Sequence, residues 1–154
     1  MRRLMIVAVA ASLGMAQPVL AADPAPSASL ARGCTAKAAK AAEPAEVAAN
    51  PAEFAGKCVS LEGWWRDIAL YPSRAEAAQT DALSIVILDQ RRVGLYLPKA
   101  QLDAAPQTAP RLVRVVGRVG GACATVAAEV RDKDDGYCHY KPGVWLAVAS
   151  VTPK

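Results

Sequence analysis

Apolar and polar residues alternate in several short runs between residues 57 and 151, which is the pattern of half-buried β-strands. In the first run, Val59, Leu61 and Trp65 share the face that we expect to be buried. Gly63 lies inside that run, and a glycine within a strand indicates a bulge or a tight bend, as a small closed barrel needs. The expected strands cover residues 57–66, 82–88, 92–97, 111–119 and 144–151.

Short helices are expected between these strands. Asn50 and Pro51 suit the N-cap and the first helical position of a helix that Gly56 would end. Residues 67–81 are predicted to form a long polar connection with one helical turn at 74–78. Further helices are expected at residues 99–105 and 122–130, and Gly120-Gly121 is expected to end the fourth strand.

Five short antiparallel strands with a helix between the third and the fourth match the five-stranded Greek-key barrel known as the OB-fold. Closing the barrel also removes the strand edges that five short strands would otherwise expose. The sequence therefore predicts an all-β protein, a small OB-like barrel with short helices. A small open α+β sheet is the alternative that the same elements allow.

Three segments resemble OB-fold domains of exported bacterial proteins. Residues 46–63 resemble the approach to their first strand, with Asn-Pro at a helix start, Gly-Lys in a turn and a strand that ends in Glu-Gly. Residues 114–119 resemble their fourth strand, and residues 146–151 resemble their closing strand. The resemblance runs from Pro44 to the last residue, and it implies a barrel without catalytic activity. The segment between Cys123 and Cys138 departs from the minimal pattern, so the resemblance carries no ligand site.

The first 22 residues have the three parts of a secretory signal peptide. Arg2 and Arg3 form the charged start, residues 4–13 are a short apolar run, and the small residues before and at Ala22 form a cleavage site. A membrane-spanning helix needs roughly 20 apolar residues, about twice the length of this run. We therefore expect cleavage, no membrane span, and a periplasmic or secreted product.

The segment that follows the signal, residues 23–43, is rich in alanine, proline, serine and lysine, and it contains no aromatic residue. Such a composition buries too little surface to offset the entropy of ordering, so a flexible linker is expected there. Residues 44–154 remain for the barrel domain.

Four cysteines in an exported chain predict two disulfides, for which three connectivities are possible. Spacing favours Cys123–Cys138 and Cys34–Cys58, and the second bond would tie the N-terminal segment to the first strand. Cys123, Cys138 and His139 could instead hold zinc, but there is no Cys-x-x-Cys pair and an oxidising compartment favours disulfides. The acidic turn at residues 131–136 lacks the spacing of a calcium-binding EF-hand loop. No metal or other cofactor is expected.

The candidate binding residues are aromatic and basic. Trp64 alternates outward beside Arg66, and an exposed tryptophan can stack on sugars, bases or cations. Alternatively, Trp64 packs under the N-terminal segment or a helix. On the third and fourth predicted strands, the residues expected on the outer face are Arg92, Tyr96, Arg114 and Arg118. The alternative for these four is an ordinary solvated strand face.

Aromatic and basic residues interleaved on an OB-like sheet suit single-stranded nucleic acid. From residue 45 onward, however, 13 basic residues face 12 acidic ones, so the supporting positive field is missing. Export also removes the usual nucleic-acid partner. The charge balance therefore argues against a nucleic-acid-binding protein.

The expected function is that of a noncatalytic binding module of the cell envelope, whose partner is an envelope protein or an oligosaccharide. The sequence has no GxSxG, HExxH or phosphate-binding glycine loop, and its acidic residues form no obvious acid–base pair. Two alternatives remain open. One is a small periplasmic enzyme with a pocket formed by Tyr137 and His139, and the other is a structural or inhibitory interaction domain.

Overall fold

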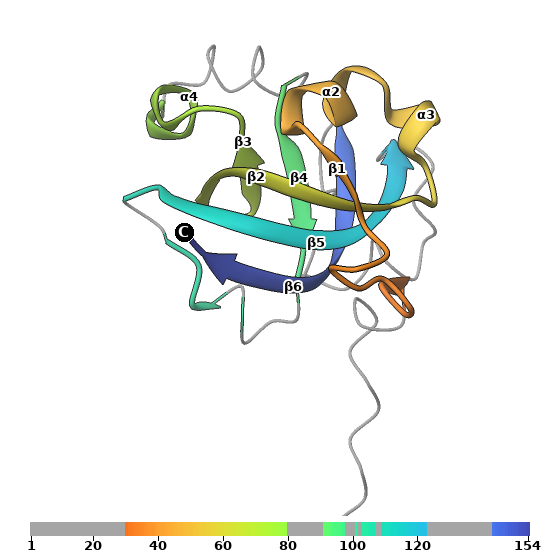
Figure 1. Ribbon diagram of the computed structural model, residues 1–154. Helices are drawn as coiled ribbons and strands as arrows, with labels where there is room; N and C mark the ends of the chain where they lie inside the picture. Colours follow the sequence, from red (N-terminus) through yellow and green to blue (C-terminus); the bar gives the residue numbers. More distant parts are fainter. Residues whose placement is uncertain (1–29, 80–90, 98–100, 102, 107–108, 123–142) are drawn as a thin grey trace, which may run out of the picture.

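Five strands close into a small mixed β-barrel in the computed structural model of the chain (Figure 1). The order around the barrel is β2 (Cys58–Arg66), β3 (Ala69–Tyr71), β4 (Val93–Tyr96), β6 (Val144–Pro153) and β5 (Arg111–Ala122), and β5 pairs back onto β2. This topology is consistent with an OB-like barrel and confirms the predicted fold class. The structure describes residues 30–79, 91–97, 101, 103–106, 109–122 and 143–154.

The expectation that all barrel strands run antiparallel is wrong for one pair. β4 and β6 run parallel, with Val93 opposite Val144 and Tyr96 opposite Ala147. The other contacts between neighbouring barrel strands are antiparallel. Parallel neighbours need a crossover connection, which the long chain segment between β4 and β6 provides.

Four of the predicted strands are confirmed as β2, β4, β5 and β6. The strand predicted at residues 82–88 lies outside the described residues. β3 instead occurs within the connection predicted at residues 67–81, so that prediction is wrong for these three residues. Three residues are too few to show an alternation, and all three are buried, so no polar face marks the strand in the sequence.

Gly120-Gly121 does not end the fourth predicted strand, because β5 continues through both glycines to Ala122. A shift in register between Val119 and Gly121 accommodates them as an irregularity in the pairing with β6. The indole ring of Trp145 lies in the space that a side chain on Gly120 would occupy. The absence of a Cβ therefore serves packing rather than strand termination.

The chain from residue 30 to residue 42, here called the N-terminal arm, is part of the fold. β1 (Lys40–Ala42) pairs in parallel with residues 59–61 of β2, and a disulfide joins Cys34 to Cys58. The disulfide predicted between these two cysteines is therefore confirmed. Within the segment expected to be a flexible linker, residues 23–43, the described part from residue 30 onward is held to the barrel by β1 and by this disulfide, and residues 23–29 lie outside the described chain.

Two short helices cover one end of the barrel (Figure 1). α2 (Pro44–Ala49) and α3 (Pro51–Phe54) follow β1, and Val47 and Phe54 on them are fully buried. Asn50 occupies the predicted N-cap position of α3, although its side-chain amide donates a hydrogen bond to the carbonyl oxygen of Glu46, 3.1 Å away. α4 (Arg74–Ala78) confirms the helical turn that was predicted there.

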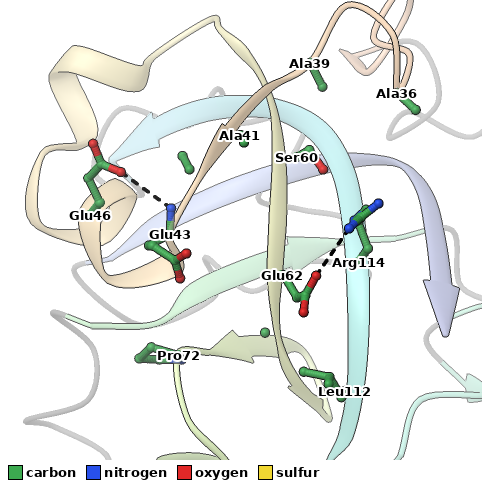
Figure 2. Close-up of a pocket in the computed structure, with 12 residues that line it drawn as sticks. Ala36, Ala39, Ala41, Glu43, Glu46, Ser60, Glu62, Pro72, Leu112 and Arg114 are labelled. Atoms are coloured by element: carbon green, nitrogen blue, oxygen red, sulfur yellow. Dashed lines mark hydrogen bonds and ion pairs between the residues drawn. The ribbon is translucent and has the colours of Figure 1, made fainter. Parts of the chain in front are cut away.

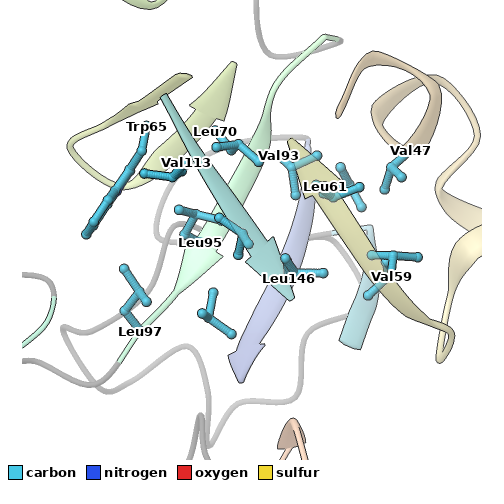
Figure 3. Close-up of a cluster of buried hydrophobic side chains, with 14 of the residues drawn as sticks. Val47, Val59, Leu61, Trp65, Leu70, Val93, Leu95, Leu97, Val113 and Leu146 are labelled. Atoms are coloured by element: carbon cyan, nitrogen blue, oxygen red, sulfur yellow. The ribbon is translucent and has the colours of Figure 1, made fainter. Parts of the chain in front are cut away.

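The core lies inside the barrel, where the inward residues of the strands meet Val47 of α2 (Figure 3). Phe54 of α3 belongs to the same buried cluster. Val59 and Leu61 are fully buried and Trp65 is 9% exposed, so the inward face predicted for β2 is confirmed. A second buried cluster contains Tyr71, Tyr96 and Trp145 together with several alanines. Side chains of both clusters alternate along β4 and β6, so these strands are covered on both faces.

Replacement of Phe54 by alanine should lower the free energy of unfolding by about 3–5 kcal/mol, because it leaves a cavity under the helical end of the barrel. Glu53→Ala, one residue earlier and exposed, is the matched control and should change stability by less than about 0.5 kcal/mol. Urea denaturation of both variants measures the difference. A similar decrease in the free energy of unfolding in both variants would show that burial of Phe54 does not stabilise this end of the barrel.

Gly63 marks the point at which β2 changes neighbours, since residues 59–61 pair with β1 and residues 64–66 pair with β3. Pairing with β5 runs without a break from Cys58 to Trp65, so no bulge forms on that edge. A Cβ on Gly63 would lie 2.7 Å from the carbonyl oxygen of Tyr71 and 2.9 Å from Cγ of Leu70. Glycine is therefore required by close packing.

Gly63→Ala should destabilise the protein by about 1–3 kcal/mol, because the added methyl group overlaps backbone as well as side-chain atoms. Ser150→Ala, at an exposed position of β6, is the control and should be near neutral. Thermal unfolding followed by circular dichroism compares the two. An unchanged Gly63→Ala protein would contradict the packing argument.

Candidate functional site

A polar groove lies on the outer side of β2, next to the point at which β1 and β3 share one edge of that strand (Figure 2). Its volume is about 900 Å³. Ser60, Glu62 and Gly63 of β2 and Arg114 of β5 line it, and alanines of the N-terminal arm form one wall. The groove therefore exists because the arm lies beside the barrel.

Glu62 and Arg114 form the charged centre of the groove. Nζ of Lys154 donates to Oε2 of Glu62 at 3.0 Å, and Nη2 of Arg114 donates to the same oxygen at 3.4 Å. The pKa of Glu62 lies below its usual value, and the hydrogen bond from Lys154 is the largest cause. The charge of Lys154 and the contacts of Arg114 lower the pKa further, while desolvation acts in the opposite direction. All three side chains remain accessible to solvent, so the ion pairs contribute little to stability and can exchange with a ligand.

Two further carboxylates stand at the end of the groove next to α2. Glu43 precedes the helix and Glu46 lies in its first turn, where its carboxylate accepts a weak hydrogen bond from the backbone N–H of Glu43 at 3.5 Å. Both residues are exposed and line the groove. Neither forms an ion pair with another residue in the described part of the chain.

The lining of the groove combines exposed charges of both signs with polar and apolar groups. Carboxylates accept hydrogen bonds at the α2 end, Arg114 supplies a donor near the centre, and Pro72 and Leu112 add apolar surface to the lining. The described lining includes no histidine or cysteine. Such a surface can hold a ligand that carries amino, hydroxyl and carboxylate groups.

Trp64, the predicted contact residue, is half-buried. The guanidinium of Arg74 lies 5.6 Å from the centre of its ring, and the ring packs against the second buried cluster. Trp64 is therefore neither a fully exposed contact residue nor a fully covered one. The binding role of Trp64 stays a prediction.

Arg66, the other candidate on β2, is a positioning residue for α4. Its Nη1 donates to the carbonyl oxygens of Ala77 at 2.8 Å and of Gln79 at 3.3 Å. These carbonyls lie at the end of the helix, where backbone acceptors have no partner within the helix. The guanidinium of Arg66 therefore holds the C-terminal end of α4 against β2.

Arg92 and Tyr96 were expected on an accessible outer face, and that exposure is wrong. Arg92 is 8% exposed and Tyr96 is 2% exposed. Nη1 of Arg92 donates to the hydroxyl oxygen of Tyr71 at 2.9 Å, while the rings of Tyr96 and Trp145 meet edge to face at 5.9 Å. The alternation along β4 was predicted correctly. The outer face of this strand is covered by the second buried cluster, so a side chain that points outward from the barrel is still buried.

Arg114 and Arg118 have different surroundings. Arg114 is exposed in the groove beside Glu62. Arg118 is half-buried and donates to the carbonyl oxygens of Gly56 at 2.7 Å and of Arg32 at 3.0 Å, so it helps to hold the arm against β5. The structure therefore brings only Arg114, among the six predicted binding residues, into the groove.

Sequence reasoning missed the three glutamates of the groove. Alternation along β2 puts Glu62 on the face opposite Leu61, but nothing in the sequence indicates that it lies near Lys154, which is distant along the chain. Glu43 and Glu46 fall on either side of the boundary predicted at Pro44. One signal in the sequence could have found this pair: acidic residues on both sides of a proline, as in Glu43, Pro44 and Glu46, are typical of the first turn of a helix.

Several predictions fall outside the described residues. These are the Cys123–Cys138 disulfide, the pocket of Tyr137 and His139, and the acidic turn at residues 131–136. Within the described ranges, no cluster of three or more potential metal ligands occurs. Over the same ranges, no helix is long and apolar enough to cross a membrane. The Cys34–Cys58 disulfide points to an oxidising compartment outside the cytoplasm.

Comparison of the chain with models of protein families, with curated proteins and with solved structures returned no match in any of the three. The topology and the groove are therefore the basis for a functional assignment.

The carboxyl group of Glu62 should titrate below the usual value of 4.5, because Lys154 and Arg114 favour its charged form. As the pH falls through this lowered pKa, Glu62 takes up a proton and the two ion pairs are lost, so their stabilising effect is present at neutral pH and disappears in acid. Carbon-detected NMR of the side chain measures the midpoint.

Lys154→Ala should raise that midpoint toward the usual value, whereas Lys57→Ala, which removes a lysine next to the ring of Phe54, should leave it unchanged. An unshifted midpoint in the Lys154 variant would show that the contact does not persist in solution.

Proposed function

We propose that this protein is a noncatalytic binding module of the cell envelope and that the groove beside the N-terminal arm holds its ligand. One observation carries the proposal: an open groove of about 900 Å³ whose lining has exposed charges of both signs. Ligand sites commonly occupy about 300–1,000 Å³. The export signal predicted at residues 1–22, together with the Cys34–Cys58 disulfide, supports a place outside the cytoplasm.

The ligand class follows from the charges. Glu43 and Glu46 suit an ammonium group at one end, and Arg114 suits a carboxylate or a hydroxyl oxygen near the centre. Short peptides attached to a wall saccharide carry all three groups. We therefore propose a peptide-bearing fragment of peptidoglycan, which combines the oligosaccharide expected from the sequence with the charges that the groove presents.

Nucleic acid fits this site poorly. The aromatic side chains on the outer side of β3, β4 and β6 are buried, so they offer no stacking platform in this conformation. The groove itself contains three carboxylates, which would repel phosphates.

Calorimetric titration of the protein with defined muropeptides tests the proposal. Glu46→Gln and Arg114→Gln should each weaken binding by about tenfold or more, because each removes a charge-assisted hydrogen bond. The matched controls are Glu53→Gln on α3 and Arg111→Gln on β5, which are exposed and lie outside the groove lining. The controls should bind like the unaltered protein.

Two results would contradict the proposal. One is the absence of binding to any muropeptide at millimolar concentration. The other is binding that all four variants retain equally, since the ligand would then lie elsewhere. Amide chemical-shift changes around Ser60 and Glu62 distinguish a groove ligand from a distant one.

A further inference from the structure

The N-terminal arm has one covalent bond to the barrel. Cys34 lies in the arm and Cys58 is the first residue of β2. Their disulfide therefore holds the arm at the beginning of β2, directly before the residues that pair with β1. Ala36, Ala39, Ala41 and Ala42 of the arm form a wall of the groove. Whatever holds the arm therefore also shapes the groove.

The noncovalent contacts of the central arm are few. β1 consists of one lysine and two alanines, residues of low strand propensity, and it has three paired positions on β2. From Thr35 to Ala41, every side chain except that of Ala39 is exposed, and Ala39 is half-buried. The stronger anchors lie before the disulfide, where Ala31 is buried and Arg118 bonds to the carbonyl oxygen of Arg32.

The barrel does not need the arm in order to close. β2 pairs with β5 from Cys58 to Trp65 and with β3 at its far end, and β4 and β6 complete the closed barrel. Loss of β1 would expose one short stretch of the β2 edge, at residues 59–61, and would leave the other strand pairs in place.

We propose that the Cys34–Cys58 disulfide is a redox-controlled tether that sets whether β1 stays on β2 and whether the groove keeps its arm wall. Cys58 is the more exposed of the two residues, since Cys34 is 6% exposed and Cys58 is half-buried. The thiolate of a dithiol reductant attacks Sγ of Cys58, the Sγ–Sγ bond breaks, and Cys34 leaves as a thiolate that takes up a proton. The second thiol of the reductant loses its proton and displaces Cys58, so the reductant becomes a disulfide and two electrons pass to the protein.

Hydrogen exchange followed by NMR tests the tether without any ligand. In Cys34→Ser/Cys58→Ser, the amides of β1 and those of residues 59–61 that face it should exchange roughly 100-fold faster, the scale on which a disulfide restricts a loop of this size. Amides of β5 and β6 that pair with each other should keep their protection. Cys123→Ser/Cys138→Ser is the matched control, because it leaves the arm cysteines as the only two in the chain.

In that control, the oxidised protein should show protected β1 amides, and addition of a dithiol reductant should release them. Equal protection of β1 with and without the arm disulfide would overturn the proposal, because noncovalent contacts would then suffice. Loss of protection throughout β5 and β6 would also overturn it, since the bond would then stabilise the whole barrel.

The effect on ligand binding rests on the proposed function and is measured separately. If muropeptides bind, the double serine variant should bind them at least tenfold more weakly. Equal affinity would show that the tether does not control the groove. If muropeptides bind neither form, the proposed function fails, while the exchange experiment still decides whether the arm is released.

Discussion

The pairing of β2 with three other strands is the constraint on which both the barrel and the groove depend. One edge of β2 is taken up by β5 from Cys58 to Trp65, and this long antiparallel contact closes the barrel. The other edge is divided between β1 and β3, with Glu62 and Gly63 between the two paired stretches. A side chain at Gly63 would overlap the carbonyl of Tyr71, so this division requires glycine. The candidate site follows from the same division, because the groove opens beside it.

The alternation of residues was enough to predict β2, β4, β5 and β6, because each has a continuous inward row of apolar side chains, such as Val59 and Leu61 on β2. It was not enough for β3, whose three residues are buried on both faces, or for β1, where lysine and alanine carry no strand signal. Both of these strands are defined by their pairing with β2 rather than by a residue pattern of their own. The disulfide that brings the arm to β2 was predicted from cysteine spacing, yet the strand that follows Cys34 was not, since a bond between two cysteines says nothing about the residues beside them.

The candidate site shows a second limit of a strand pattern. Alternation places Arg92 and Tyr96 outward, and it is correct, but it cannot say what covers an outward side chain. In this barrel the outer aromatic residues Tyr71, Tyr96 and Trp145 form a buried cluster of their own. The accessible chemistry therefore lies with charged residues from distant parts of the chain, above all Glu62 with Lys154. Contacts of this kind depend on the register between strands, and the register cannot be read from the residue pattern of a single sequence.

Magnitudes explain why a disulfide belongs at the arm. In the chain-entropy model, a cross-link between residues 24 positions apart contributes about 3 kcal/mol. Cross-strand side-chain pairs contribute roughly 0.2–1 kcal/mol each more than a pair of alanines does, and two of the three paired positions of β1 are themselves alanines. The covalent bond is therefore the larger contribution to holding that wall of the groove, and a short, lysine-bearing strand at the edge limits pairing with other chains while it does so.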